Sequence, residues 1–157
     1  MKIILKLTYL LVLLLATSCS NKVETPLVSN ALPPIFPDYI GVTIPAEIAP
    51  MNFDIAQGVD YQRVDVVIKG GKRGELHVNA KRVNFPIKQW RKLLRENLGD
   101  SLQFTVSIKQ GDDWKQYQPF CMYISPYAID YGIVYRKIAP GYELYNKMGI
   151  YERNLST

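Results

Sequence analysis

The chain has 157 residues, with 19 Lys or Arg against 14 Asp or Glu, and a formal net charge of +5. This length suits one domain with a sizeable hydrophobic core. Without Lys2 and Lys6, which lie in the first 18 residues, 17 basic residues remain against 14 acidic ones, a net charge of +3. This excess is far below that of typical nucleic-acid-binding proteins. We therefore expect no nucleic-acid partner.

The first nineteen residues contain the parts of an export signal. Lys2 and Lys6 precede an apolar run over residues 7–16, shorter than the about 20 residues that a membrane-spanning helix needs. The ending Leu-Ala-Thr-Ser-Cys resembles the lipobox of bacterial lipoproteins, where cleavage precedes a lipid-bearing Cys. We expect a signal peptide over residues 1–18, fatty acyl chains such as palmitate on Cys19, and attachment to the bacterial cell envelope, at the periplasmic face or the cell surface. An ordinary secreted protein is the alternative.

Residues 19–37 are expected to form an extended, lipidated tether. They contain four prolines: Pro26, Pro33, Pro34 and Pro37. A first strand near Pro33 to Ile40 is the alternative for the end of this segment. Residues 38–157 then form the folded module.

From Ile40 onward, short alternating segments are separated by turn residues, a pattern typical of half-buried strands. The expected strands cover residues 42–44, 51–55, 62–69, 75–80, 101–109, 114–118, 120–125 and 129–138. The loop from Gly70 to Gly74 lacks the Gly-Lys-Ser/Thr ending of a phosphate-binding P-loop, so a hairpin turn is expected there. The pattern predicts a mainly β fold, an antiparallel, immunoglobulin-like β-sandwich with one helix.

The one expected helix runs from Pro86 to Leu98, with Asn84 as its cap and Gly99 at its exit. Five apolar residues are expected to face the core: Ile87, Trp90, Leu93, Leu94 and Leu98. A basic edge lies on the adjoining arc and consists of Lys88, Arg91, Lys92 and Arg95. This basic edge is expected to be a solvated flank, and contact with anionic headgroups or acidic glycans is the functional alternative.

Residues suited to catalysis are few. His77 is the only histidine and no zinc-ligand spacing surrounds it. A nucleophile and base pair made of Cys121 and His77 would need a third, orienting group. We expect His77 to be exposed, and Asp112 and Asp113 to lie in a hairpin turn. Cys121 is expected to be a buried apolar thiol, with a reactive or intermolecular thiol as the alternative. No metal, no cofactor and no enzymatic activity are expected.

Tyrosine is concentrated near the C-terminus, where eight of the eleven lie between Tyr117 and Tyr151. A tyrosine ring offers a large apolar area together with a hydroxyl, which suits an interface. The expected contact surface for a protein or glycan partner consists of Tyr127, Tyr131, Tyr135, Tyr142 and Tyr145. Ordinary packing is the alternative. Rings along a shallow groove would favour a glycan, and a flat patch near the C-terminus would favour protein docking.

Several short segments between Pro33 and Ser156 share one family pattern. They are Phe85-Pro86 with Trp90, Trp114 to Phe120, Ile124-Ser125, Tyr135-Arg136, and Pro140-Gly141-Tyr142-Glu143 through Met148-Gly149-Ile150-Tyr151. The chain thereby resembles the N-terminal region of a family of Gram-negative envelope lipoproteins. Longer members continue into a Cys-x-x-Cys-His segment, as in c-type haem attachment, and then a TolB or WD40-like propeller. This sequence has no such segment, so the resemblance implies no haem here.

The expected function is a lipid-anchored, non-catalytic binding or docking module on the envelope. An accessory to redox or cytochrome maturation is the alternative, which the resemblance implies only through the continuation of its longer members. The chain would then be a truncated product of a larger propeller protein, and otherwise a free-standing copy of the N-terminal module. An enzyme is the third and least supported reading.

Overall fold

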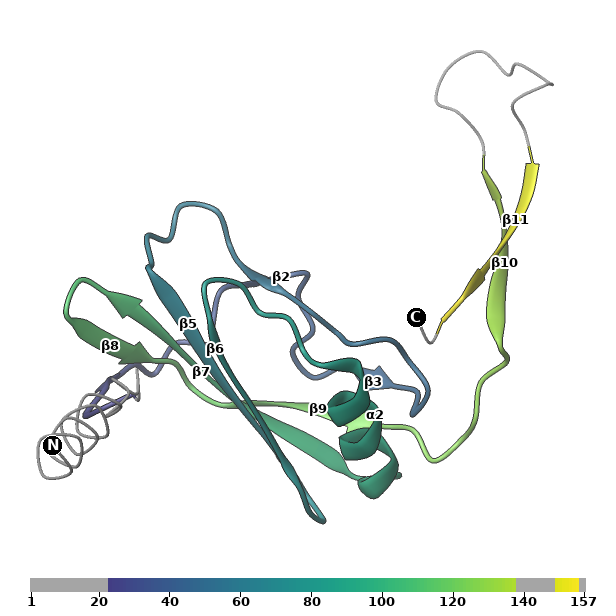
Figure 1. The fold of residues 1–157 in the computed structure, drawn as a ribbon, viewed down its shortest axis with the longest axis horizontal. Coiled ribbons are helices and arrows are strands. Elements are labelled where there is room, and N and C mark those ends of the chain that lie inside the picture. Colours follow the sequence, from purple (N-terminus) through teal and green to yellow (C-terminus); the bar gives the residue numbers. More distant parts are fainter. Residues whose placement is uncertain (1–22, 138–148, 156–157) are drawn as a thin grey trace, which may run out of the picture.

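The computed structural model describes residues 23–137 and 149–155, and in these residues the chain is mainly β with one helix (Figure 1). The largest element is a seven-stranded sheet. Its strands are β1 (Leu27–Val28), β3 (Thr43–Ile44), β5 (Arg63–Gly70), β6 (Glu75–Ala80), β7 (Ser101–Gln110), β8 (Asp113–Gln116) and β9 (Phe120–Ile124). Two further strand pairs lie outside this sheet: β2 (Ile35–Phe36) with β4 (Asp54–Ile55), and β10 (Gly132–Lys137) with β11 (Gly149–Asn154).

The sheet is built around β7. Along one edge, β7 pairs antiparallel with β5, from Leu102 opposite Gly70 to Lys109 opposite Arg63, and β6 follows on the far side of β5. Along the other edge, β7 pairs with β9 near its start and with β8 near its end. The central position of β7 agrees with its pattern, because its alternating apolar residues Leu102, Phe104, Val106 and Ile108 are all fully buried.

The expectation of a mainly β fold with one helix is confirmed, but the sheet is mixed and is not clearly the expected antiparallel, immunoglobulin-like sandwich. β1 joins β8 in parallel and β3 joins β9 in parallel. Both come from the N-terminal part of the chain, which runs along sheet edges whose free backbone groups accept a strand in either direction. Over the apolar face, the core is completed by the helix and by residues 33–61, and no second extended sheet faces the first within the described residues.

The core lies between this sheet and the helix α2 (Ile87–Glu96). The Trp90 ring stacks on Phe85 with 5.5 Å between centroids, and Phe85 meets Phe104 of β7 edge to face at 6.3 Å. The Trp90 indole also donates a hydrogen bond to the carbonyl of Ile48, at 3.2 Å. The helix, the sheet and the N-terminal segment are thus joined at one aromatic cluster.

α2 is shorter than the expected helix at both ends. Asn84 does not cap it, because its Oδ1 accepts a hydrogen bond from Asn52 Nδ2 at 3.1 Å, and the N-cap position is occupied by Pro86. The expected core positions Trp90, Leu93 and Leu94 are buried. The expectation was wrong for the two terminal positions, since Ile87 is 38% and Leu98 41% exposed and Leu98 lies beyond the last helical residue.

The folded body begins before residue 38. β1 and β2 lie within the segment expected to be a tether, and Ile35 is buried opposite Ile55 of β4. β2 corresponds to the alternative of a first strand near Pro33 to Ile40. The leader and Cys19 lie outside the described residues. In the described part of the chain, no helix has the length and apolar character required to cross a membrane.

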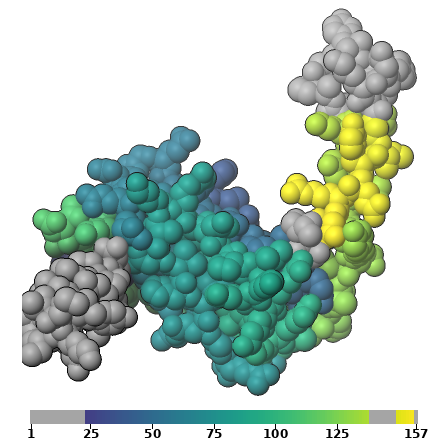
Figure 2. Space-filling view, viewed as in Figure 1, coloured from purple at the N-terminus to yellow at the C-terminus, as the bar shows by residue number. Residues whose placement is uncertain are grey.

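The antiparallel hairpin of β10 and β11, which we call the hairpin arm, leaves the body after β9 and projects away from it (Figures 1 and 2). Its six cross-strand pairs run from Gly132 opposite Asn154 to Lys137 opposite Gly149. At its base, the Ala49 amide donates a hydrogen bond to the Leu155 carbonyl at 2.8 Å. β10 lies within an expected strand, whereas β11 falls in a tyrosine-rich tail for which no strand was expected.

Candidate functional site

Exposed apolar side chains of the described residues concentrate in the hairpin arm and in the segment that leads to it. Tyr127 is 79% exposed, Val134 69% and Ile150 80%. The full set is Tyr127, Ile129, Tyr131, Ile133, Val134, Tyr135, Ile150 and Tyr151. Exposed apolar surface of this extent marks an interaction site more often than isolated exposed residues do.

Both faces of the hairpin arm carry apolar side chains. On one face, Tyr135 lies directly opposite Tyr151, and their rings stack with 5.8 Å between centroids. On the other face, Ile150 lies opposite Arg136, and Val134 lies opposite Glu152. A strand pair that covered a core would be apolar on one face and polar on the other, so this pattern is not that of a hairpin lying on its own body.

Three of the five tyrosines expected as a contact surface lie in this region. Tyr127 and Tyr131 are strongly exposed and precede β10, and Tyr135 lies within it, 42% exposed. Tyr142 and Tyr145 lie outside the described residues. By contrast, Tyr117 belongs to the core, and burial raises the pKa of its hydroxyl. The alternative of ordinary packing therefore holds for Tyr117 and not for the exposed three.

A hollow of about 450 Å³ lies between the body and the start of this exposed segment. Tyr123 and Tyr127 line it, together with Pro126 and the β3 residue Thr43. Tyr123 points away from the core because it takes the outward phase of β9, and it is 51% exposed. The apolar surface of the hairpin arm thus continues onto the edge of the body.

The open face of the sheet carries a polar network around Asp65. This carboxylate is only 5% exposed, and its Oδ1 lies 2.7 Å from both His77 Nε2 and Asn79 Nδ2. Asn79 Oδ1 in turn accepts a hydrogen bond from Arg63 Nε at 2.9 Å. His77 is 49% exposed at its side chain, so the expectation of a surface histidine is confirmed, while its carboxylate partner was missed. The register of β5 against β6 explains the network, because Asp65 lies directly opposite Asn79.

The pair of Cys121 and His77 is not assembled. Cys121 lies on β9 and His77 on β6, with β7 and β5 between them. Three strand spacings separate the two side chains by about 14 Å, too far for proton transfer. Cys121 is a free, partly buried thiol on the open face, which corrects the expectation of a fully buried one. Within the described residues, no group of three or more His, Cys, Asp or Glu side chains is placed to hold a metal ion.

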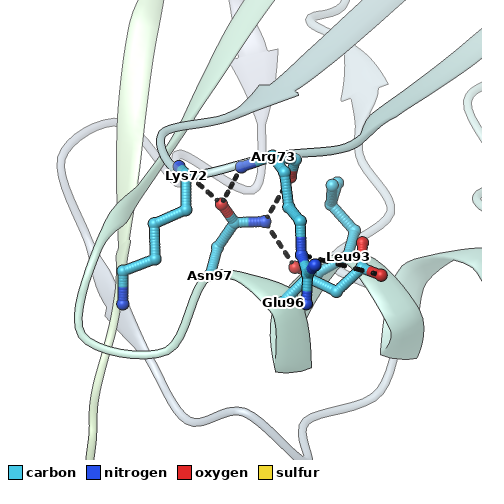
Figure 3. A network of polar contacts seen from close by, with 5 residues as sticks. All are labelled: Lys72, Arg73, Leu93, Glu96 and Asn97. Atoms are coloured by element: carbon cyan, nitrogen blue, oxygen red, sulfur yellow. Dashed lines mark hydrogen bonds and ion pairs between the residues drawn. The ribbon is translucent and has the colours of Figure 1, made fainter.

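The glycine loop from Gly70 to Gly74 is a hairpin turn between β5 and β6, as expected (Figure 3). The amides of Lys72 and Arg73, which would have to point at a bound phosphate, both donate to Asn97 Oδ1, at 2.9 and 3.2 Å. Asn97 Nδ2 donates to the carbonyls of Arg73 and Leu93, each at 2.8 Å. Asn97 is fully buried, so it joins the loop to the end of α2 and occupies the loop's donors.

The basic edge lies on α2 away from the core. Lys88, Lys92 and Arg95 are exposed and Arg91 is partly buried, while Trp90 and Leu94 occupy the opposite side of the helix. This arrangement agrees with a solvated flank. The alternative of contact with anionic headgroups or acidic glycans stays a prediction.

No family model, no curated protein and no solved structure matches this chain. Two arrangements were not expected from the sequence: the Asp65 network, and an ion pair of Arg82 with Asp54 in a hollow beside Phe36. The polar outward phase of β5 was a usable signal for the first. The second joins Asp54 of β4 to Arg82 in the connection after β6, 28 residues away, and no periodicity reveals such a contact.

Proposed function

We propose that this protein is a lipid-anchored, non-catalytic docking module of the bacterial cell envelope, and that its hairpin arm binds a protein partner. One observation carries the proposal: a two-stranded hairpin projects from the body with apolar side chains exposed on both faces. An isolated two-stranded hairpin is marginally stable in water, so a further strand or surface would stabilise it.

A protein partner suits this surface better than a glycan. Tyr135 and Tyr151 stack on each other, so each ring has one face already covered and cannot offer that face to a sugar. β10 and β11 pair only with each other among the described residues, which leaves a backbone edge on each. A partner strand can add to such an edge through main-chain hydrogen bonds, while its side chains pack on Val134 and Ile150.

The anchor is supported by the sequence alone. A lipid on Cys19 would hold the body close to the membrane, since β1 begins at Leu27, only a few residues later. Two or more acyl chains make such attachment stable, whereas one chain anchors only marginally. The hairpin arm, which leaves the opposite end of the chain, would remain accessible to a partner.

The docking proposal is tested by photo-crosslinking in cells. A photoreactive amino acid at Tyr131 or Val134 should form one dominant protein adduct, and the same residue at the exposed position Gln89 on α2 should not. The adduct partner, once purified, should bind the wild-type protein and bind the double variant Tyr131→Ala, Val134→Ala at least about tenfold more weakly, because a tyrosine ring that becomes buried at an interface often dominates the binding energy. Equal binding by the double variant would contradict the proposal.

The anchor is tested separately by Cys19→Ala. The wild-type protein should fractionate with membranes and gain the mass of acyl chains at its mature N-terminus, whereas the variant should remain soluble after cell lysis. Cys121→Ala is the matched control, because it removes the other thiol without touching the leader. Membrane association that survives Cys19→Ala would remove the anchor and leave the docking proposal to be judged on its own.

A further inference from the structure

A second concave surface lies on the body, where an ion pair of Arg82 and Asp54 stands between two hollows. One hollow has a volume of about 460 Å³ and the other about 870 Å³, and both are lined by Phe36, Asp54 and Arg82. Both volumes fall within the range of about 300–1,000 Å³ that is typical of small-molecule sites. We call this surface the Arg82 groove.

Separate parts of the chain build the groove. Phe36 of β2 and Asp54 of β4 are cross-strand partners, so their side chains lie on the same face of this short ribbon. Arg82 comes from the connection between β6 and α2, and reaches across to Asp54. The Phe36 ring is 71% exposed although Ile35, its neighbour in β2, is buried in the core. The alternation of the strand therefore directs an aromatic ring outward beside the ion pair.

The ion pair leaves the groove without a net charge of its own. Arg82 Nε and Nη2 donate to the two carboxylate oxygens of Asp54, at 3.1 and 2.7 Å. This hydrogen bonding lowers the pKa of Asp54 and so favours the ionised carboxylate. The side chains remain 77% and 47% exposed, which leaves lone pairs of Asp54 and N–H groups of Arg82 open to solvent. A ligand meets paired, planar donors and acceptors rather than an uncompensated charge.

Further planar polar groups surround the pair. The first hollow is also lined by Asn52 and Asn84, and the second by Gln57 and Tyr61. Asn52 is held in place, because its Oδ1 accepts from the Phe85 amide at 2.8 Å and its Nδ2 donates to Asn84 Oδ1. In the described part of the chain, this leaves the Nδ2 group of Asn84 without a protein acceptor. The groove is therefore partly preorganised for hydrogen bonding.

We propose that the Arg82 groove binds a neutral saccharide chain. Adjacent hydroxyl groups of a sugar can donate to Asp54 and accept from Arg82 or Asn84 at the same time. The C–H groups on one face of the ring can pack on the exposed Phe36 ring. Hollows on both sides of the ion pair give room for sugar units on either side of a central one. This site is separate from the hairpin arm, so it adds a ligand class to the proposed docking function.

Other ligand classes fit the groove less well. An anion would have to compete with Asp54 for the guanidinium of Arg82, at a distance where the two negative charges repel. A largely apolar ligand would leave the amides and the ion pair desolvated without partners. A peptide segment is the remaining competitor, and the experiment below separates it from a sugar.

The test is an NMR titration of the purified protein with neutral oligosaccharides. The probes are linear hexamers of β-linked glucose, α-linked glucose, β-linked N-acetylglucosamine and β-linked mannose, each at millimolar concentration. At least one should shift the amide signals of Phe36, Asp54 and Asn84 while those of the hairpin arm stay in place. Phe36→Ala and Arg82→Ala should each weaken that binding by about tenfold, since each removes one of the two dominant contacts.

Val28→Ala is the control, because it truncates an apolar side chain of similar exposure outside both the groove and the hairpin arm, and it should change sugar affinity less than about twofold. Three results would overturn the proposal: no shift with any of the four sugars, shifts that persist unchanged in both groove variants, or groove shifts only with a tyrosine-free random peptide pool. Loss of sugar binding would leave the crosslinking result at the hairpin arm intact, so the two proposals fail independently.

Discussion

Two hairpins of the described residues have equal pairing and unequal surroundings. β5 with β6 and β10 with β11 are each antiparallel with six cross-strand pairs. In the β5–β6 hairpin, β7 pairs with the other edge of β5 and the core packs on one face, so Val66 and Ile68 are fully buried. The hairpin arm has neither, and Val134 and Ile150 are exposed. The same local geometry is therefore part of the core sheet in the β5–β6 hairpin and forms a projecting surface in the hairpin arm.

This difference shows that strand pairing alone says little about stability. Burying a Val or Ile side chain contributes roughly 1.5–3 kcal/mol, whereas a cross-strand pair on an exposed face contributes about 0.2–1 kcal/mol. The β5–β6 hairpin has both contributions, and the hairpin arm has only the smaller one. Substitutions in the body should thus change global stability, and substitutions in the arm should change partner binding.

The largest effect is expected from Trp90→Ala in the core under the first hairpin. The change removes a ring that is fully buried, stacks on Phe85 and bonds the Ile48 carbonyl. It should lower the free energy of unfolding by about 3–5 kcal/mol, measured by urea denaturation. Lys92→Ala on the exposed side of α2 is the control and should have little effect. A loss below about 1 kcal/mol would show that the core is not where the structure places it.

The second prediction concerns the contact that fixes the turn of the first hairpin. Asn97→Ala removes both bonds to the amides of Lys72 and Arg73 and leaves the carbonyl of Leu93 without its side-chain donor. Because unsatisfied groups at a buried site each cost about 1–3 kcal/mol, destabilisation of about 2–3 kcal/mol is expected in the same assay. In the variant, amide hydrogen exchange should speed up more at Lys72 and Arg73 than in β7. Unchanged exchange in the turn would contradict the role given to Asn97.

The strands that the sequence predicted most closely each have one buried face, and β11, which it missed, has none. β5, β6, β7 and β9 were predicted within a residue or two, because each is half-buried and its period of two is set by a core on one side. β11 was missed because neither of its faces is buried, so no core imposes an alternation of apolar and polar residues on its sequence. The exposure of Lys88, Lys92 and Arg95 has the corresponding reason, since the core covers one side of α2 and leaves charged residues on the other.

The candidate sites were less predictable. Exposure of Tyr127, Tyr131 and Tyr135 was expected from composition, but the projection of the hairpin arm was not. The ion pair joins Asp54 of β4 to Arg82 in the connection between β6 and α2, so only the folded chain brings them together. The hairpin register of β5 and β6 is a long-range signal that the sequence did contain, and it would have paired Asp65 with Asn79.

A third, smaller effect should distinguish the arm from the body directly. Tyr151→Ala removes the ring stacked on Tyr135, yet the global free energy of unfolding should change by less than about 1 kcal/mol. Amides of β10 and β11 should exchange faster in the variant, and should already exchange faster than those of β5 and β6 in the wild-type protein. The matched substitution Leu76→Ala in β6, which is 2% exposed, should be strongly destabilising. Comparable losses for the two variants would erase the distinction between the hairpins.

The smallest effect is expected from the ion pair of Asp54 and Arg82 on the body. Like the contacts of the hairpin arm, this pair is exposed and should contribute little to global stability. Hydrogen bonding to Arg82 lowers the pKa of Asp54 below its usual value of 3.8. A carboxyl group with a depressed folded-state pKa stabilises the protein above its unfolded-state pKa and loses that contribution as the pH falls through the folded-state value. Asp54→Asn should therefore lower the melting temperature slightly at neutral pH and not at all well below pH 3.8. Both side chains are largely exposed, so solvent screens the ion pair. Asp54→Asn should therefore change the stability at neutral pH less than Tyr151→Ala does.

The Arg82→Gln background provides the control for this pH dependence. There the partner that depresses the pKa of Asp54 is absent, so Asp54→Asn should shift the melting temperature equally at both pH values. If the pH dependence persisted without Arg82, another group would have to perturb Asp54. The charge-neutral pair on which the saccharide proposal depends would then be the wrong description of the groove, even though the hairpin arm and its partner would be unaffected.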